Sequence, residues 1–191
     1  MVIPISFYAK PSPLRERMHD FKEHSDETVR ARESRNVAAI AARYITEHGG
    51  ALAAKFGTWD ETVAVPSTHH SDRPALQSAI EDNFPGIFAP FARPLIQGPG
   101  NMDFNQASES GFLPAGVVDG KRYLLIDDTF TTGARLHSAH HALVAGGAIV
   151  PAAIIVTRKI NPSPLYGSLA MWNRQTQVAF RFDAPPWWSA R

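Results

Sequence analysis

The feature that most constrains this chain is an apolar strand that runs into two aspartates, three threonines and a glycine. Residues 123–134 read YLLIDDTFTTGA. The apolar run predicts a buried strand, and the apolar spacing after Gly133 predicts a helix. The first amides of a helix have no partners within the helix, and the positive end of its dipole faces the preceding loop. We therefore expect this loop to bind an anion such as a phosphate.

The side chains in and before the loop indicate a ligand that carries other groups besides a phosphate. The threonine hydroxyls at positions 129, 131 and 132 add donors, and Gly133 lets the backbone approach an anion closely. Asp127 and Asp128 would repel a phosphate, so the ligand must also offer hydroxyl groups or share a metal ion. A ribose 5-phosphate meets this requirement, because its ring hydroxyls can donate to the aspartates. The alternative is an ordinary strand-to-helix turn, but capping a helix does not need paired aspartates and three threonines.

The rest of the chain alternates between predicted helices and strands. Apolar periodicity and turn residues predict helices near residues 12–21, 26–48, 74–84 and 134–145, the second of them ending at Gly49-Gly50. Strands are expected at 62–65, 92–96, 123–127 and 148–157, with a hairpin turning at Asp119-Gly120 and a last strand in the tail after residue 171. This order predicts an α/β fold, with a doubly wound, mostly parallel sheet and helices on both of its faces.

The segment LLIDDTFTTG at residues 124–133 resembles the signature with which type I phosphoribosyltransferases bind phosphoribosyl pyrophosphate, PRPP. The resemblance implies a parallel-sheet core and a small hood built from terminal segments. It also implies that PRPP binds with Mg²⁺ and that its 5-phosphoribosyl group passes to a nitrogen nucleophile, a nucleobase or a related amine, with release of pyrophosphate. We expect a single domain over residues 1–191, in which about 1–50 form a helical extension that contributes to the hood or to a cover.

The resemblance also implies roles for individual residues. Asp127, Asp128 and Arg73 are expected to be catalytic, and the two aspartates to contact the metal indirectly, through the Mg²⁺ bound to PRPP. The residues expected to bind substrate are Ser67, Thr68, Thr129, Phe130, Thr131, Thr132, Gly133 and Arg158. Among these, the two hydroxyls at positions 67 and 68 would hold the diphosphate together with Arg73.

Residues 97–115 stand where the family keeps a flexible catalytic loop. They are rich in Gly, Ser, Asn and Pro, which predicts a long mobile loop. Unlike the loop of many relatives, this one contains no Lys or Arg. The charge that assists the departing pyrophosphate must then come from elsewhere, and Arg73, Arg93 and Lys121 are candidates. A loop without Lys or Arg leaves open a second function, that of a non-catalytic regulatory protein that senses PRPP or a nucleotide.

Composition limits the other classes of function. The net charge of +1 gives no basic excess, so no nucleic-acid partner is expected. The absence of cysteine excludes a thiolate nucleophile and fits a reducing cytoplasm. The longest apolar run, residues 145–156, is too short to cross a bilayer, so no membrane association is expected. We therefore expect a cytoplasmic protein. The resemblance implies PRPP and a small acceptor as its partners, and we also expect a homodimer.

Overall fold

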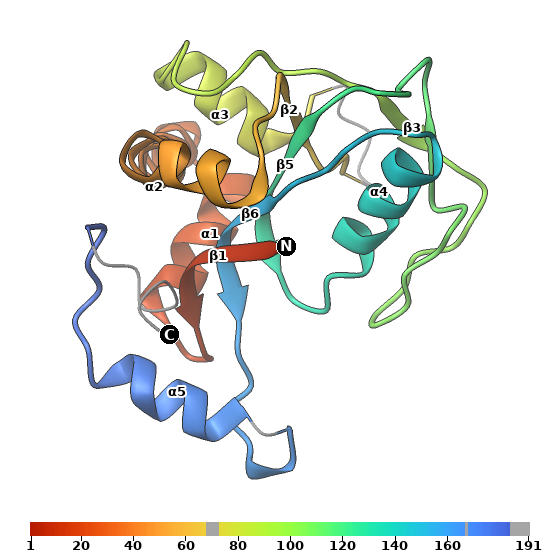
Figure 1. The fold of residues 1–191 in the computed structure, drawn as a ribbon. Helices are drawn as coiled ribbons and strands as arrows, with labels where there is room; N and C mark the ends of the chain where they lie inside the picture. The colour runs from red at the N-terminus through yellow and green to blue at the C-terminus, as the bar shows by residue number, and fades with distance from the viewer. Residues whose placement is uncertain (68–72, 167, 184–191) are drawn as a thin grey trace.

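The structure, a computed structural model, describes residues 1–67, 73–166 and 168–183 (Figure 1). Its strands are β1 (Val2–Tyr8), β2 (Glu61–Ala64), β3 (Leu95–Gln97), β4 (Phe112–Pro114), β5 (Tyr123–Phe130) and β6 (Ala153–Lys159). Its helices are α1 (Pro13–Glu23), α2 (Glu27–Phe56), α3 (Ala75–Asn83), α4 (Ala134–Ala145) and α5 (Ser168–Thr176), with a short 3-10 turn, η1 (Pro164–Tyr166). Among the described helices, none combines the length and the apolar character that crossing a membrane requires.

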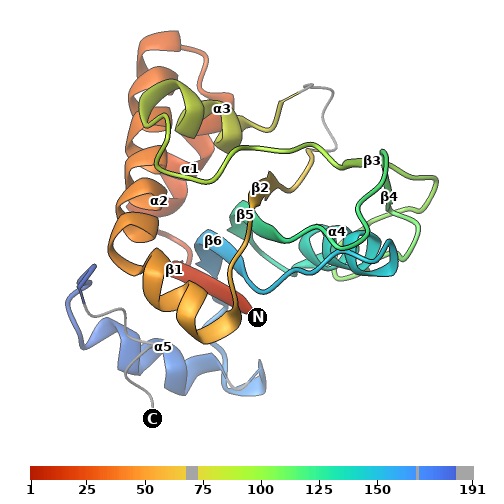
Figure 2. The same ribbon diagram turned by 45° about the horizontal axis from the view of Figure 1, so that its top comes forward.

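The centre of the fold is a four-stranded parallel sheet in the order β1-β6-β5-β2. Helices α1, α2 and α3 lie on one face, and α4 lies on the other (Figure 2). This arrangement confirms the expected α/β fold with a parallel sheet and helices on both faces. Strand β5, which carries the paired aspartates, lies between β6 and β2, so its carboxyl end opens at the edge where ligands bind in such sheets.

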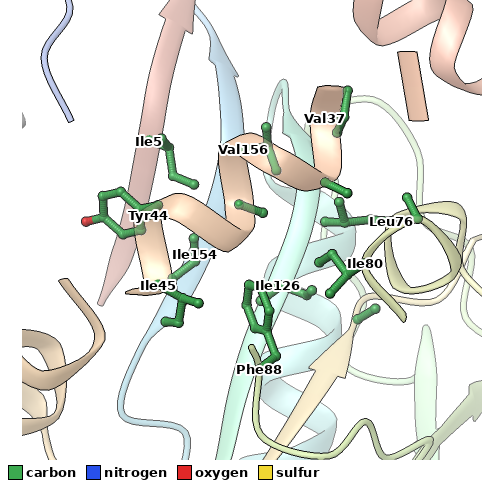
Figure 3. Close-up of a cluster of buried hydrophobic side chains, with 14 of the residues drawn as sticks. Ile5, Val37, Tyr44, Ile45, Leu76, Ile80, Phe88, Ile126, Ile154 and Val156 are labelled. Carbon is green, nitrogen blue, oxygen red and sulfur yellow. The ribbon is translucent and has the colours of Figure 1, made fainter. Parts of the chain in front are cut away.

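The face under α2 and α3 is a continuous apolar cluster (Figure 3). The sheet contributes Ile126, Ile154 and Val156, and α2 covers them with Val37 and Tyr44. Burying each aliphatic side chain of this size stabilises the fold by about 1.5–3 kcal/mol. The cluster therefore fixes the position of α2 against β5 and β6.

The opposite face packs against α4. Leu125 and Ile155 point to this side, where Leu136 and Leu143 of the helix meet them. Successive residues of β5 thus enter different clusters, because side chains alternate between the faces of a strand. A strand that is buried on both sides reads as an unbroken apolar run, which is why the sequence identifies β5 so clearly.

The first 50 residues contribute a strand to the central sheet as well as helices. Strand β1 pairs in parallel with β6 along the edge of the sheet, a strand that the sequence did not predict. The predicted end of the second helix at Gly49-Gly50 is wrong, because α2 continues to Phe56. The two glycines cost about 1 kcal/mol each in a helix, but Leu52 in the added turn is fully buried. The helix ends instead at Gly57, whose φ of 102° suits a residue without a side chain.

Two other local predictions are wrong. Val118 and Lys121 close a turn around Asp119-Gly120 through a 3.1 Å hydrogen bond, but no hairpin follows. Strand β5 pairs with two parallel neighbours instead. In the tail, the start of the segment expected to form a strand belongs to α5, which lies beyond the end of β6 (Figure 1), and residues 177–183 add no strand. The rest of that segment, residues 184–191, lies outside the described residues. A polar face and a spacing of three to four between Leu169, Trp172 and Thr176 suit a helix better than a strand.

Candidate functional site

The predicted strand, loop and helix are present, and the strand is longer than expected. Strand β5 keeps parallel pairing with β6 through Asp127, Thr129 and Phe130, so the two aspartates belong to the strand itself. Gly133 then adopts a left-handed conformation with φ of 80° and precedes α4. A side chain at this position would overlap the ring of Phe130. Glycine is therefore required at the point where the chain turns from the strand into the helix.

The aspartates and the loop line a single cavity of about 420 Å³. Its predicted members are Asp127, Asp128, Thr129, Thr131, Thr132 and Gly133. Three further groups that sequence reasoning missed also line it, namely Lys22, Arg135 and residues 102–104. The structure thus brings carboxylates, hydroxyls, helix amides and two cations to one place.

The two carboxylates have different environments. Burial raises the pKa of Asp127 to about 7, with a further contribution from the charge of Asp128, although Arg135 and Lys22 act in the opposite direction. The amide of Asp128 donates to Oδ1 of Asp127 at 2.9 Å, which holds that carboxyl group in place. Near neutral pH, Asp127 can therefore exist as a neutral acid or as a carboxylate, so it can both donate and accept hydrogen bonds.

Lys22, in the last turn of α1, forms an ion pair with Asp128. The Nζ atom lies 2.7 Å from Oδ1 and 2.6 Å from Oδ2 of the carboxylate. No local pattern signals this pair, because 106 residues separate the partners. Only the packing of α1 on the sheet places the ammonium group over the end of β5.

Arg135 supplies the second cation, from the first turn of α4. Its Nη2 atom donates to the carbonyl of Pro66, which ties the segment after β2 to the helix. Its Nε atom is buried and has no hydrogen-bond partner. Arg135 follows the threonine loop directly in the sequence, and that position was the signal that sequence reasoning overlooked.

Two of the residues predicted to hold the diphosphate, Arg73 and Ser67, are not among the described residues that line this cavity. Arg73 contacts α3, with 2.7 Å to Ser78 Oγ and 3.1 Å to each of Glu81 and Asp82. Ser67 is partly buried and is absent from the described lining of the cavity. Thr68 lies outside the described residues. The diphosphate role of these positions stays a prediction.

Arg158 and Phe130 meet beside the first cavity. Arg158 stands near the end of β6, and its guanidinium carbon lies 5.1 Å from the centre of the Phe130 ring. Such a contact is attractive, because the face of an aromatic ring carries partial negative charge. Arg158 lines a second cavity, which shares Thr131 and Thr132 with the first.

Backbone hydrogen bonds hold the two ends of the segment 97–115 together. Strands β3 and β4 pair in an antiparallel manner, and Gly100 donates to the carbonyl of Ser110 at 2.9 Å. The amide of Ser108 donates to Ser138 Oγ of α4 at 2.8 Å. The part of the segment that reaches the cavity is residues 102–104.

The acidic pair fits Mg²⁺ in its chemistry. Mg²⁺ prefers oxygen ligands and is usually held by one or two carboxylates together with substrate phosphates. Asp127 and Asp128 supply such oxygens, and no group of three or more metal-ligating side chains occurs elsewhere in the part of the chain that the structure describes. A metal at this site would therefore have to share its ligands with a bound phosphate compound.

No family model and no curated protein matches the chain. Among solved structures it is similar to UMP synthase from Leishmania donovani, with 14% identity and a TM-score of 0.37 over 80% of this chain and 32% of that one. It is also similar to adenine phosphoribosyltransferase from Leishmania tarentolae, with 14% identity and a TM-score of 0.37 over 62% of this chain and 69% of that one. The chain thus spans about a third of the length of that UMP synthase. The α/β assignment rests on the parallel sheet of this chain itself.

Proposed function

We propose that the protein is a phosphoribosyltransferase, which transfers the 5-phosphoribosyl group of PRPP to a nitrogen nucleophile and releases pyrophosphate. One observation carries the proposal. A single cavity is lined by the paired carboxylates of Asp127 and Asp128 and by the threonine loop that leads into α4. A ligand that fills it must present both an anion and hydroxyl groups, and a ribose 5-phosphate does so.

Each part of the site has a role in holding the sugar. The 5-phosphate would accept hydrogen bonds from the hydroxyls of Thr131 and Thr132 and from the first amides of α4, where the helix dipole favours an anion. The ribose hydroxyls would donate to Asp127 and Asp128. When Mg²⁺ is bound with PRPP, it supplies charge neutralisation for the diphosphate, and the same two aspartates would contact it indirectly.

The reaction needs positioning more than covalent help from the protein. The bond between C1 of the ribose and the diphosphate oxygen breaks, a bond from C1 to the nitrogen forms, and the nitrogen loses a proton. The transition state at C1 resembles a cation, so fixed carboxylates near the sugar stabilise it electrostatically. Holding both reactants in line lowers the barrier further, because their relative motion has already been restricted.

A second function has specific support. Arg73, expected to meet the departing diphosphate, contacts Ser78, Glu81 and Asp82 of α3. Residues 97–115 offer no Lys or Arg in its place. A protein with a sugar-phosphate site in which no cation meets the leaving group would sense PRPP or a nucleotide without turning it over.

The remaining parts of the proposal come from the family resemblance alone. They are a nucleobase or related amine as acceptor and Mg²⁺ as cofactor. A homodimer and a cytoplasmic location are further expectations, the second of them from the composition of the chain. We expect no nucleic-acid or membrane partner.

Titration calorimetry with PRPP and Mg²⁺ tests the site. The double variant Asp128→Asn with Thr132→Ala should bind at least about tenfold more weakly, because charged hydrogen bonds contribute about 1.5–3 kcal/mol each. The matched control is Thr58→Ala with Asp60→Asn, two exposed residues outside the cavity. Equal affinity in wild type and the site variant would refute the assignment.

A panel of nucleobases and amines, followed by pyrophosphate release, then separates the two functions. Release by wild type that is lost in the double variant supports transfer. Tight binding of PRPP with no release for any acceptor supports the sensor.

A further inference from the structure

A second cavity of about 480 Å³ lies beside the first. The two share Phe104, Thr131 and Thr132 in their linings, so a ligand held by the threonine loop borders both. The second cavity collects side chains from the ends of β1 and β6 and from the start of α5. Among its described lining residues, Thr131 and Thr132 have a role in the function proposed above, and Arg158 is predicted from the sequence to bind substrate.

The second cavity is cationic. Lys10, Arg158 and Lys159 line it, and among its described lining residues none is acidic. Within the described part of the chain, these three side chains form no ion pair. Three like charges around one cavity repel one another, and an anion between them removes that cost.

The backbone explains why the cations meet. Strands β1 and β6 are parallel neighbours, with Tyr8 opposite Lys159, and the amide of Ile160 donates to the carbonyl of Tyr8 at 2.7 Å. Both strands therefore end at the same level, and Lys10 lies just beyond the end of β1. Arg158 and Lys159 are partly buried, so their charges are screened less than those of ordinary surface residues.

The cavity also has surfaces that suit a flat ring. Phe104 stands at the border of both cavities with 76% of its surface exposed, which is unusual for so large an apolar side chain. Met171 of α5 and the buried Ile160 add apolar contacts. Aromatic and apolar walls with a few charged groups are typical of pockets that hold small planar ligands.

We infer that this second cavity binds the acceptor, and that the acceptor is a planar nitrogen-containing ring that carries a carboxylate. The inference rests on the proposed function in one respect, since it takes the anion to belong to the reactant that receives the phosphoribosyl group. In the function proposed above the sugar phosphate fills the first cavity, whereas the second offers three cations and no described acidic residue to a carboxylate. A neutral ring would leave Lys10, Arg158 and Lys159 without a counter-charge.

Matched pairs of ligands test the charge directly. Titration calorimetry compares nicotinate with nicotinamide, and uracil-6-carboxylate with uracil, on the full chain with and without saturating ribose 5-phosphate. At least one acid should bind wild type about tenfold or more tightly than its neutral partner, because a hydrogen bond between charged groups contributes about 1.5–3 kcal/mol. If neither acid binds, or if the neutral rings bind equally well, the inference is wrong.

Variants locate the carboxylate. Arg158→Gln and Lys159→Gln should each weaken the acid about tenfold and leave the neutral ring within about twofold. Arg35→Gln in α2 removes the same charge from an exposed position outside the cavity and should change neither. Arg158→Lys should restore part of the affinity, and thermal melting shows whether each variant is folded. If the Arg158 variant does not fold, a weaker affinity of Lys159→Gln for the acid, with an unchanged affinity for the neutral ring, supports the inference by itself.

Two further titrations distinguish this inference from the proposed function and from a phosphate site. If Arg158→Gln and Lys159→Gln weaken ribose 5-phosphate or inorganic phosphate as much as the acid, the cavity holds a phosphate and the inference fails. If wild type binds the acid through these residues but does not bind ribose 5-phosphate, the carboxylate site stands and the transferase proposal fails.

Discussion

The ammonium nitrogen of Lys22 lies 2.6 Å from Oδ2 of Asp128, so helix α1 closes over the acidic end of β5. The carboxylate of Asp128 is 13% exposed and the lysine side chain 35%, which makes this pair more shielded than an ordinary surface ion pair. A ribose hydroxyl that donates to Asp128 competes with the ammonium group for the carboxylate oxygens. Lys22 would then be released beside a bound polyanion.

We expect Lys22→Met to bind ribose 5-phosphate about three- to tenfold more tightly than wild type, because no ion pair has to be broken. The affinity for PRPP should increase less, because Lys22 of the wild type can leave Asp128 and pair with the diphosphate of PRPP instead. Calorimetry with both ligands measures the difference. Lys22→Arg keeps the charge and serves as the control. Weaker binding of ribose 5-phosphate to Lys22→Met would show that the lysine contacts the sugar phosphate itself.

Asp127 should make the stability of the fold depend on pH. Burial, and secondarily the charge of Asp128, raises its pKa from the ordinary 3.8 to about 7 in the folded protein. The folded state therefore holds the proton more tightly than the unfolded state, and the free energy of unfolding falls as the pH rises from about 4 to about 7. Asp127→Asn removes this group, so we expect the free energy of unfolding of the variant to exceed that of wild type by about 4 kcal/mol at pH 8, because each unit of the raised pKa corresponds to about 1.4 kcal/mol. The advantage should vanish near pH 4, and urea denaturation at both pH values measures it. A pH-independent difference would contradict the raised pKa.

Gly133→Ala should damage both the fold and the site. The left-handed φ of 80° is strained for alanine, and the added methyl group would overlap the ring of Phe130. We expect a loss of about 1–3 kcal/mol in the free energy of unfolding and weaker binding of ribose 5-phosphate. Gly116→Ala is the matched control, because that glycine has open space around it and no positive φ. Equal behaviour of the two variants would show that the turn before α4 is not constrained.

Arg73→Ala should lower turnover of PRPP more than it weakens ribose 5-phosphate, if the guanidinium leaves α3 to meet the diphosphate. We expect a loss of about tenfold in kcat/KM and less than twofold in the affinity for ribose 5-phosphate. Steady-state pyrophosphate release and calorimetry measure the two quantities. If the contacts with Glu81 and Asp82 are the whole role of this residue, the variant loses only about 0–1 kcal/mol of stability and turnover is unchanged.

The segment 97–115 should respond to ligand mainly in the part that lies near the cavity. Backbone hydrogen bonds of Gly98 and Gly100 already hold its base, so their amides should be protected from hydrogen exchange without ligand. Residues 102–104 line the cavity and should gain protection when ribose 5-phosphate or PRPP with Mg²⁺ binds. Hydrogen exchange followed by mass spectrometry measures both parts. Equal protection of residues 102–104 in both states would contradict closure of this segment over the ligand.

The sequence by itself determined those parts of the protein that depend on neighbours along the chain. The unbroken apolar run of β5, the two aspartates and the glycine before α4 lie within about a dozen residues, and their geometry follows from strand burial and backbone preference. The order of strands and helices likewise predicted a parallel sheet with helices on both faces, because only that arrangement buries such alternating segments.

Other features depend on residues that are far apart, and the tertiary structure decided them. The pairing of β1 with β6 brings Lys10 and Lys159 to the same cavity. The packing of α1 places Lys22 on Asp128, across 106 residues of sequence. The continuation of α2 past Gly49-Gly50 was decided in the same way, by the burial of Leu52. Arg73 contacts the carboxylates of α3 although its position in the sequence predicted a diphosphate ligand. A charge pairs with the opposite charges that the fold brings within reach, and sequence order does not specify that distance.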